Sequence, residues 1–369
     1  MAEILAARAR AGESILLGGA FTKNRLGGSM APAAARISTE GLAKLLQYEP
    51  KDLTISVQAG MKWADLLALL AGNRQTIPLD PPWGSQATAG GVVVSNLCGP
   101  RRRFFGSARD MVIGMKYATL EGKLVQTGGM VVKNVAGLDT AKLMIGSLGT
   151  LAAVVSVNFK LFPAAPATGT WLFHYASLAA AIEKRNWLLA GVLQPWSADL
   201  LNPHAAAMVG EEGWVLAIQA GGSERLMERY GRELHGARRL YGEREERFWN
   251  AIREFAPAFL RDRVDGVVAR LPVPLASVGD VAATASMPFL CRAGNGVCQG
   301  FFPDIGGAAE WLRESRERGW NGVVEFHGSE GGGQELWPYP GEDLAAMEKI
   351  KRMLDPGHLL NRGRLHGRI

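Results

Sequence analysis

The sequence predicts an α+β protein built from two domains. The length of 369 residues suits two domains. Segments with the alternation of strands and segments with the spacing of helices follow one another along the chain. Between the halves, the segment PAAPATG at residues 163–169 interrupts all periodicity with two prolines and a glycine. We therefore expect one domain over residues 1–165 and a second over residues 166–369.

In the first half, short apolar or alternating runs predict strands at residues 15–19, 53–57 and 155–161. A helix is predicted over residues 61–70, because its apolar side chains fall on one face, with Gly72 as its C-cap. Residues 112–127 are expected to form a hairpin that turns at Glu121-Gly122. Residues 137–144 are expected to form a short helix with Asp139 in its first turn.

In the second half, helical spacing of apolar residues predicts two helices between Glu224 and Phe255. Strands are predicted at residues 214–220, 266–271 and 321–326, which makes this half α+β as well. Four tryptophans are expected in the core of this half: Trp196, Trp214, Trp249 and Trp311.

Composition excludes several classes of protein. No apolar run approaches the roughly 18 residues that a membrane span needs, and the N-terminus does not have the pattern of a secretory signal. The three cysteines form no CxxC, so the sequence indicates neither a disulfide framework nor a metal site. The cytoplasm is therefore the expected compartment.

The formal charge of +6 is moderate, and its densest part is the run Arg101-Arg102-Arg103 beside Phe104 and Phe105. Basic residues next to aromatic ones are typical of nucleic-acid binding. This run is short and lies inside a glycine-rich stretch, so a solvated loop or an anion clamp fits it better. We expect no nucleic-acid partner.

Two glycine-rich stretches, at residues 79–106 and 128–151, carry the main functional signal. Glycine lets the backbone approach a large ligand closely, and free N–H groups in such turns bind phosphate oxygens. Neither stretch contains GxxxxGK[ST], and the nearest approach to GxGxxG, at residues 294–299, lacks the third glycine. The sequence thus favours a phosphate-bearing cofactor held by neither a Walker-type nor a Rossmann-type site.

The motifs occur in the order GGAFTK, PLDPP, ATAGG, GPRRRFFG and KNVAGLDTAKLMIGSLGTL. This series resembles the FAD-binding domain of the vanillyl-alcohol oxidase (PCMH) type. Within that superfamily it is most similar to the FAD-binding E subunits of bacterial glycolate oxidases. The resemblance is close over residues 15–163 and weaker through residues 246–249 and 354–364. It implies a two-subdomain FAD-binding domain, followed by an α+β cap domain whose C-terminal tail returns to the FAD domain.

The resemblance also implies which residues bind the cofactor, FAD. A first loop would meet the diphosphate, a second would lie along the diphosphate and isoalloxazine, and a third would pack on the adenine and ribose side. The residues carried over are Gly18, Gly19, Ala20, Phe21, Thr22 and Lys23; Pro81, Thr88, Gly90, Gly91, Ser95, Asn96 and Gly99; and Gly146, Ser147, Gly149 and Thr150.

By the same resemblance, the chain is expected to be the FAD-binding subunit of a glycolate-type 2-hydroxy-acid oxidase or dehydrogenase complex. Its partners would be a larger FAD-containing subunit and an iron–sulfur subunit, and the complex would allow peripheral contact with the inner membrane. Two other functions remain open: a self-sufficient FAD-dependent enzyme acting on a small hydroxy acid such as D-lactate, and a structural subunit with a vestigial flavin site.

The chain departs from the family at several points. The HGDGN-type histidine motifs are missing from residues 325–332, so no metal site is expected, and no motif predicts a covalent flavin link. No catalytic residue can be assigned. Arg101–Arg103 and Arg109 are candidates for binding a substrate carboxylate or stabilising reduced flavin, and the alternatives are a salt bridge with Asp110 or a docking surface. Lys133-Asn134 are candidates for polar contacts on the catalytic side, with a structural turn as the alternative. His327 and His358 are weak candidates for a base, and Cys98 is expected to be a small buried hydrophobe.

Overall fold

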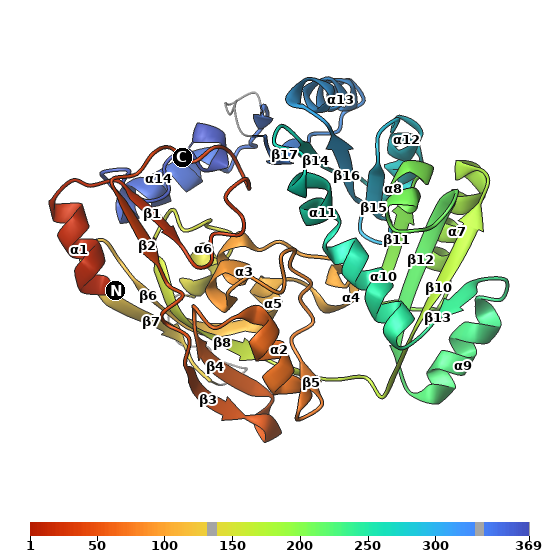
Figure 1. Ribbon diagram of the computed structural model, residues 1–369, viewed down its shortest axis with the longest axis horizontal. Coiled ribbons are helices and arrows are strands. Elements are labelled where there is room, and N and C mark those ends of the chain that lie inside the picture. Colours follow the sequence, from red (N-terminus) through yellow and green to blue (C-terminus); the bar gives the residue numbers. More distant parts are fainter. Residues whose placement is uncertain (131–138, 329–335, 369) are drawn as a thin grey trace.

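The computed structural model describes residues 1–130, 139–328 and 336–368. In these ranges it mixes helices with mainly antiparallel sheets, so the predicted α+β class is confirmed. Figure 1 shows two bodies of secondary structure, one around a five-stranded sheet and one around an eight-stranded sheet.

The N-terminal body is built on a five-stranded antiparallel sheet in the order β3-β4-β8-β6-β7. Two small sheets flank it, the parallel pair β1-β2 and the antiparallel pair β5-β9. Its strands are β1 (Ile15–Gly18), β2 (Ala35–Ser38), β3 (Leu45–Glu49), β4 (Thr54–Gln58), β5 (Gln75–Thr76), β6 (Val112–Ala118), β7 (Leu124–Gly128), β8 (Ala153–Lys160) and β9 (Phe162–Pro163). Its helices are α1 (Ala2–Arg10), α2 (Trp63–Ala71), α3 (Ala89–Ser95), α4 (Arg102–Phe105), α5 (Ala108–Met111) and α6 (Ala141–Met144).

The C-terminal body is built on an eight-stranded antiparallel sheet in the order β13-β10-β12-β11-β15-β16-β14-β17. Its strands are β10 (Ala167–Tyr175), β11 (Ser197–Leu201), β12 (Trp214–Gly222), β13 (Arg238–Leu240), β14 (Val267–Pro272), β15 (Phe289–Arg292), β16 (Val297–Phe302) and β17 (Val323–Phe326). Its helices are α7 (Leu178–Ala190), α8 (Pro203–Met208), α9 (Glu224–Glu233), α10 (Glu243–Arg253), α11 (Phe255–Arg261), α12 (Val278–Ala283) and α13 (Ile305–Glu317).

The last helix, α14 (Leu344–Leu354), and the segment after it leave the C-terminal body and lie beside β1 of the N-terminal body (Figure 1). Leu360 forms a parallel bridge with Ile15, which joins this tail to the first strand. The tail therefore comes back to the strand that opens the chain's first glycine loop.

Buried apolar side chains explain how the helices pack on the two sheets and how the two bodies meet. In the N-terminal body, β4 and β8 bury Ile55, Val57, Val157 and Phe159 against Trp63 and Leu66 of α2. In the C-terminal body, α8, α10 and α11 share one apolar cluster, while α7, α12 and α13 share another with the same sheet. Leu26, Trp83, Leu97 and Leu148 of the N-terminal body pack on the first of these clusters. The two bodies thus share apolar surface along the face that carries the glycine loops.

Several local predictions need correction. The loop of the β6–β7 hairpin spans five residues, Thr119 to Lys123, so Glu121-Gly122 is not a two-residue turn. Helix α6 begins after Thr140, which leaves Asp139 outside its first turn. Gly72 ends α2 in the right-handed region, with φ −57°, and not in the left-handed conformation of a glycine cap.

Trp196 does not lie in the core of the C-terminal half. It is half-buried, and its ring lies 5.2 Å from that of Phe105 and 6.4 Å from that of Phe104, both on α4. The other three tryptophans do pack in or against that half's apolar clusters. Trp196 is an aromatic contact between the two bodies.

Candidate flavin site

The first glycine loop follows β1 and packs directly on the second. A Cβ at Gly19 would overlap Oγ1 of Thr88, and a Cβ at Gly18 would lie 2.6 Å from the ring of Phe21. Phe21 itself has a φ of +54°, which is unusual for a residue other than glycine. Both glycines are therefore required by close approach, and the loop is fixed in one conformation against Thr88.

The second loop is organised by Thr88, the N-cap of α3, whose Oγ1 accepts a hydrogen bond from the N–H of Gly91 at 3.2 Å. The helix ends at Asn96 in the left-handed conformation, with φ +47°. Gly90 packs on the backbone and Cβ of Ala59, where a side chain would not fit. A short glycine helix therefore lies tightly on the central sheet, with one end at the first loop and the other at the interface between the bodies.

The third loop, residues 146–150, is held by the C-terminal tail. Nδ2 of Asn361 donates to the carbonyl oxygen of Leu148 at 2.8 Å, and Nζ of Lys351 donates to that of Thr150 at 2.8 Å. Gly149 has a φ of +71°, and a Cβ there would lie 2.7 Å from Nδ2 of Asn361. The tail thus fixes the third loop through two buried side chains.

Two adjoining hollows connect these loops. The loop cavity, of about 70 Å³, is lined by the first loop together with Thr88, Gly91, Ser95 and Arg364. The interface cavity, of about 470 Å³, lies between the ends of α3 and β14–β17. Both are lined by Leu26, Ser95 and Leu148, so they meet there. An elongated ligand could occupy both, because the two cavities share these lining residues.

The structure brings most of the expected site residues to these two cavities. The loop cavity is lined by Gly18, Gly19, Ala20, Phe21, Thr22, Lys23, Thr88, Gly91 and Ser95. The interface cavity is lined by Ser95, Asn96, Gly99 and Gly146. Five expected residues line neither: Gly90, Ser147, Gly149, Thr150 and Pro81. Gly90 and Gly149 have the packing roles described above, Oγ1 of Thr150 donates to the carbonyl oxygen of Ser147, and Pro81 lines a separate cavity.

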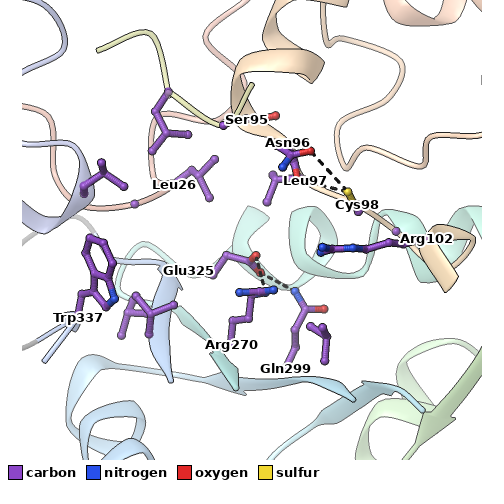
Figure 2. Close-up of a pocket in the computed structure, with 18 of the residues that line it drawn as sticks. Leu26, Ser95, Asn96, Leu97, Cys98, Arg102, Arg270, Gln299, Glu325 and Trp337 are labelled. Atoms are coloured by element: carbon purple, nitrogen blue, oxygen red, sulfur yellow. Dashed lines mark hydrogen bonds and ion pairs between the residues drawn. The ribbon is translucent and has the colours of Figure 1, made fainter. Parts of the chain in front are cut away.

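Figure 2 shows the polar walls of the interface cavity. Arg270 on β14 and Gln299 on β16 point toward Glu325 on β17. Nε2 of Gln299 donates to Oε2 of Glu325 at 2.6 Å, and Nε of Arg270 lies 3.9 Å from Oε1. From the opposite wall, Arg102 extends toward them, and its guanidinium has no hydrogen bond or ion pair among the described residues. The cavity therefore presents positive charge from both bodies.

The arginine run divides among three environments. Arg101 binds both oxygens of the buried Asp80, with Nη2–Oδ1 at 2.7 Å, while Arg102 lines the interface cavity. Nη1 of Arg103 donates to the carbonyl oxygen of Gly294 in the C-terminal body at 3.2 Å. Burial alone would raise the pKa of Asp80, but Arg101 beside it holds that pKa below its usual range. Of the two roles expected for this run, an anion clamp fits Arg102.

A third cavity, the arginine cavity, has a volume of about 780 Å³ and lies between residues 79–86 and the helices α10 and α11. Arg253 projects from the end of α10, and its one ion pair among the described residues is a 4.0 Å contact with Asp80, whose oxygens Arg101 already holds. The next residue, Glu254, accepts hydrogen bonds from the N–H groups of Trp83 and Gly84 at 3.0 and 2.9 Å. Thus the C-terminal end of α10 both holds the segment that leads to Thr88, through Glu254, and brings the guanidinium of Arg253 beside it.

The loop cavity has the electrostatics of an anion site. Burial lowers the pKa of Lys23 to about 8, with a smaller opposing effect from Glu254, and burial lowers the pKa of Arg364 to about 10. Nε of Arg364 is buried without a hydrogen-bond partner in the described chain. Buried cations and an unpaired donor beside the first glycine loop fit a dinucleotide diphosphate.

Two histidines lie near the same tail. Burial lowers the pKa of His366 to about 4, so its imidazole is neutral near pH 7. His366 lines the interface cavity, and its Nδ1 has no partner in the described chain. Burial also lowers the pKa of His327, whose Nδ1 lies against the carbonyl oxygen of Gly328. His358 is exposed.

Sequence reasoning missed His366, Arg253 and Arg364 as site residues. The sequence signal that could have found them is that each lies in or shortly after a motif shared with the family. His366 and Arg364 follow Asn361 in the end segment, and Arg253 follows the FW pair at residues 248–249. Of the other candidates, Cys98 is half-buried at the interface cavity, Arg109 is exposed, and Lys133-Asn134 lie outside the described residues. Within the described ranges, no cluster of His, Cys, Asp or Glu has the geometry of a metal site, and no helix is long and apolar enough to cross a bilayer.

Comparisons with known proteins agree with this geometry. Residues 1–128 match a family model described as an FAD binding domain. Glycolate oxidase subunit GlcE of Escherichia coli is 28% identical over 335 residues, covering 88% of this chain and 85% of that protein. A solved structure of alkyldihydroxyacetonephosphate synthase superposes with a TM-score of 0.73 at 15% identity, covering 97% of this chain and 73% of the other.

Two further relatives match the N-terminal part more locally. Glycolate oxidase subunit GlcD of Bacillus subtilis is 31% identical over 43% of this chain and 34% of that protein. A D-lactate dehydrogenase of Anaerostipes hadrus is 31% identical over 45% of this chain and 33% of that protein. The chain thus aligns with only about a third of the length of these two relatives.

Proposed function

Because this chain belongs to the FAD-linked oxidoreductases that carry an FAD-binding domain of the vanillyl-alcohol oxidase (PCMH) type, we propose that it is the FAD-binding subunit of a complex that oxidises a 2-hydroxy acid. Its cofactor is FAD. The relatives that support the substrate class are two glycolate oxidase subunits and a D-lactate dehydrogenase. We further propose that residues 1–165 form the FAD-binding domain and residues 166–369 the cap domain with its returning tail.

The observation that carries the substrate class is the guanidinium of Arg253. It lies in the arginine cavity beside the segment that leads into the second glycine loop, and its one ion pair in the described chain is the long contact with Asp80. Burial lowers the pKa of Arg253, while Asp80 and, to a smaller extent, Glu254 and Glu246 raise it, and its side chain is 29% exposed. A planar guanidinium binds a carboxylate through two parallel hydrogen bonds. A small 2-hydroxy acid would supply that carboxylate.

Bound FAD would supply the two-electron redox chemistry, and the chain's own residues would position it and the substrate. The three glycine loops would hold the cofactor, with Lys23 and Arg364 as the cations of the loop cavity. Arg253 would orient the acid, while Arg101 keeps Asp80 ionised and therefore acceptor-only. Trp63, Trp83 and Leu67 would exclude water from the arginine cavity.

We propose a larger FAD-containing subunit and an iron–sulfur subunit as partners, with peripheral contact between the complex and the inner membrane. The glycolate oxidase subunits among the relatives support a complex of several chains. Purification of the chain with whatever accompanies it tests this proposal. A yellow preparation that contains two further chains, one of them iron-bearing, is the expected result; a colourless chain that purifies alone would contradict it.

The substrate class is tested by anaerobic mixing of the complex with glycolate or D-lactate, following loss of flavin absorbance. Arg253→Met should raise the acid concentration for half-maximal reduction by about 10- to 100-fold. Arg247→Met is the control, because Arg247 lies on the same helix with its side chain 72% exposed. Equal behaviour of the two variants would overturn the assignment of Arg253.

One observation favours a self-sufficient enzyme as a second candidate. His366 is neutral near pH 7 and presents an unpaired Nδ1 beside the interface cavity, so it can accept a hydrogen bond from a hydroxyl group. Bleaching of the isolated yellow chain by glycolate or D-lactate would support this candidate. Bleaching only in the presence of partners would support the subunit role.

A further inference from the structure

The C-terminal tail places one arginine in the cavity of the first glycine loop. Arg364 is 7% exposed and lines the loop cavity together with the run from Leu17 to Asn24. Its Nη1 donates to the carbonyl oxygen of Leu26 and, at 3.3 Å, to that of Asn24. Its Nε is buried and has no hydrogen-bond partner in the described chain. Nη1 thus fixes the guanidinium to the loop, whereas the Nε–H group has no hydrogen-bond acceptor in the described chain.

Among the residues that the structure describes, no acidic side chain lines this cavity to accept a hydrogen bond from that donor. Its lining consists of backbone, apolar side chains, hydroxyl groups, Asn24 and the two cations Lys23 and Arg364. Lys23 interacts electrostatically with Glu254, whereas burial is the one influence on Arg364, whose pKa falls to about 10. An uncompensated buried cation is unfavourable, so an anionic ligand would stabilise this cavity.

The position of Arg364 is fixed by the tail on both sides. The N–H of Ala31 donates to the carbonyl oxygen of Arg362 at 2.8 Å, and the N–H of His366 donates to that of Gly27 at 3.0 Å. Between them Gly363 has a φ of +89°, and a Cβ there would overlap the carbonyl oxygen of Ser29. The hydrogen bonds of the tail therefore fix Arg364 at one position against the first loop.

We propose that Arg364 is a ligand of the FAD diphosphate, donating its Nε–H to a phosphate oxygen and closing the site from the C-terminal end of the chain. This inference rests on FAD as the cofactor and names a contact of that cofactor beyond the glycine loops. A charge-assisted hydrogen bond from a buried guanidinium is among the stronger single contacts that a phosphate makes. The ligand class is a nucleotide diphosphate, because the cavity is lined by the first glycine loop, and free backbone N–H groups in such loops bind phosphate oxygens.

The test measures binding of three probes to the FAD-free full chain: FAD, ADP and riboflavin. Arg364→Gln should weaken FAD and ADP by about 10- to 100-fold and change riboflavin, which has no diphosphate, by less than about 2-fold. Arg362→Gln is the matched control, because Arg362 lies two residues earlier in the same tail with an exposed side chain. The control should bind all three probes as the parent does.

A purely structural role for Arg364 predicts a different pattern. If the guanidinium only ties the tail to Leu26 and Asn24, then Arg364→Gln weakens riboflavin as much as ADP, and that result would overturn the proposal. Arg364→Lys keeps the charge and the volume closer to those of the parent, so it is the second variant if the glutamine variant does not fold. Arg364→Lys should bind ADP more weakly than the parent yet more tightly than Arg364→Met. Equal ADP affinities of Arg364→Lys and Arg364→Met would also overturn the proposal.

The outcomes separate this inference from the proposed function. Failure of the parent chain to bind FAD would remove the cofactor and with it both claims. FAD binding that depends on Arg364, without reduction by any 2-hydroxy acid in the presence of partners, would remove the proposed substrate and leave the diphosphate contact standing.

Discussion

The side chain of Asn361 forms a pair of hydrogen bonds with the backbone of Leu17, 344 positions earlier. Its Oδ1 accepts from the N–H of Leu17 at 2.7 Å, and its Nδ2 donates to the carbonyl oxygen of Leu17 at 2.9 Å. The same Nδ2 also donates to the carbonyl oxygen of Leu148 at 2.8 Å. One amide therefore joins the strand before the first loop to the third loop.

Asn361→Ala should lower the free energy of unfolding by about 2–4 kcal/mol, because it leaves three buried backbone groups without partners. Urea unfolding of the FAD-free chain measures this. Asn73→Ala is the control, since Asn73 is exposed in the turn after α2, and it should fall within about 0.5 kcal/mol of the parent. Similar midpoints for both variants would show that the tail is not coupled to the loops.

Gly19→Ala should abolish tight FAD binding. The new methyl group would overlap Oγ1 of Thr88, so the first and second loops would have to separate. Gly41→Ala is the matched control, because Gly41 is exposed and a Cβ there meets nothing within 4 Å. Flavin retained on gel filtration measures the effect, and a yellow Gly19→Ala chain would refute the close contact of the two loops.

Lys23→Met should stabilise the FAD-free chain at neutral pH. Burial lowers the pKa of Lys23 to about 8 from 10.5, so folding carries the cost of a buried charge at every pH below about 8. Between those two values the unfolded chain binds the extra proton, and the parent's stability rises with pH. The advantage of the variant should therefore be up to about 3 kcal/mol near pH 7 and fall below about 1 kcal/mol near pH 10.

Urea unfolding of parent and variant near both pH values measures this difference. The same substitution should weaken FAD binding, since a cation of the loop cavity is removed. A stability difference that stays constant with pH would show that the ammonium of Lys23 is not buried in the free chain.

Lys351→Met should destabilise the chain by about 3–5 kcal/mol. Nζ of Lys351 lies 2.6 Å from Oδ2 of the fully buried Asp355, and removing the cation leaves that carboxylate unpaired. Lys349→Met, an exposed lysine on the same helix, should change little. Thermal unfolding of both variants measures this, and equal transition temperatures would contradict a buried ion pair.

The glycine loops could be predicted from the sequence, because a backbone that packs closely against a ligand or another segment requires glycine, and clusters of glycine are visible in the composition. Gly18, Gly19 and Gly91 face one cavity as the family order suggested. Glycines that serve internal packing, such as Gly90 against Ala59 and Gly149 against Asn361, leave the same mark, so composition could not separate the two uses.

Contacts between residues far apart in the sequence could not be predicted from the sequence. The division of Arg101, Arg102 and Arg103 among three environments depends on how α4 meets the C-terminal body, which no local pattern encodes. The same holds for Trp196, whose partners are on α4. Strand β11 was missed for a different reason: all five of its residues are buried, so it has no alternation to detect.

The return of the tail to β1 has a consequence for biosynthesis. Translation must pass residue 366 before Asn361, Arg364 and His366 can reach the loops laid down near residue 18. A ribosome-bound chain whose first half has already folded would thus have a dinucleotide site that lacks the contacts of the tail. Flavin uptake in the cell should accordingly follow synthesis of the segment through residue 366, and nascent chains stalled before that residue should remain colourless.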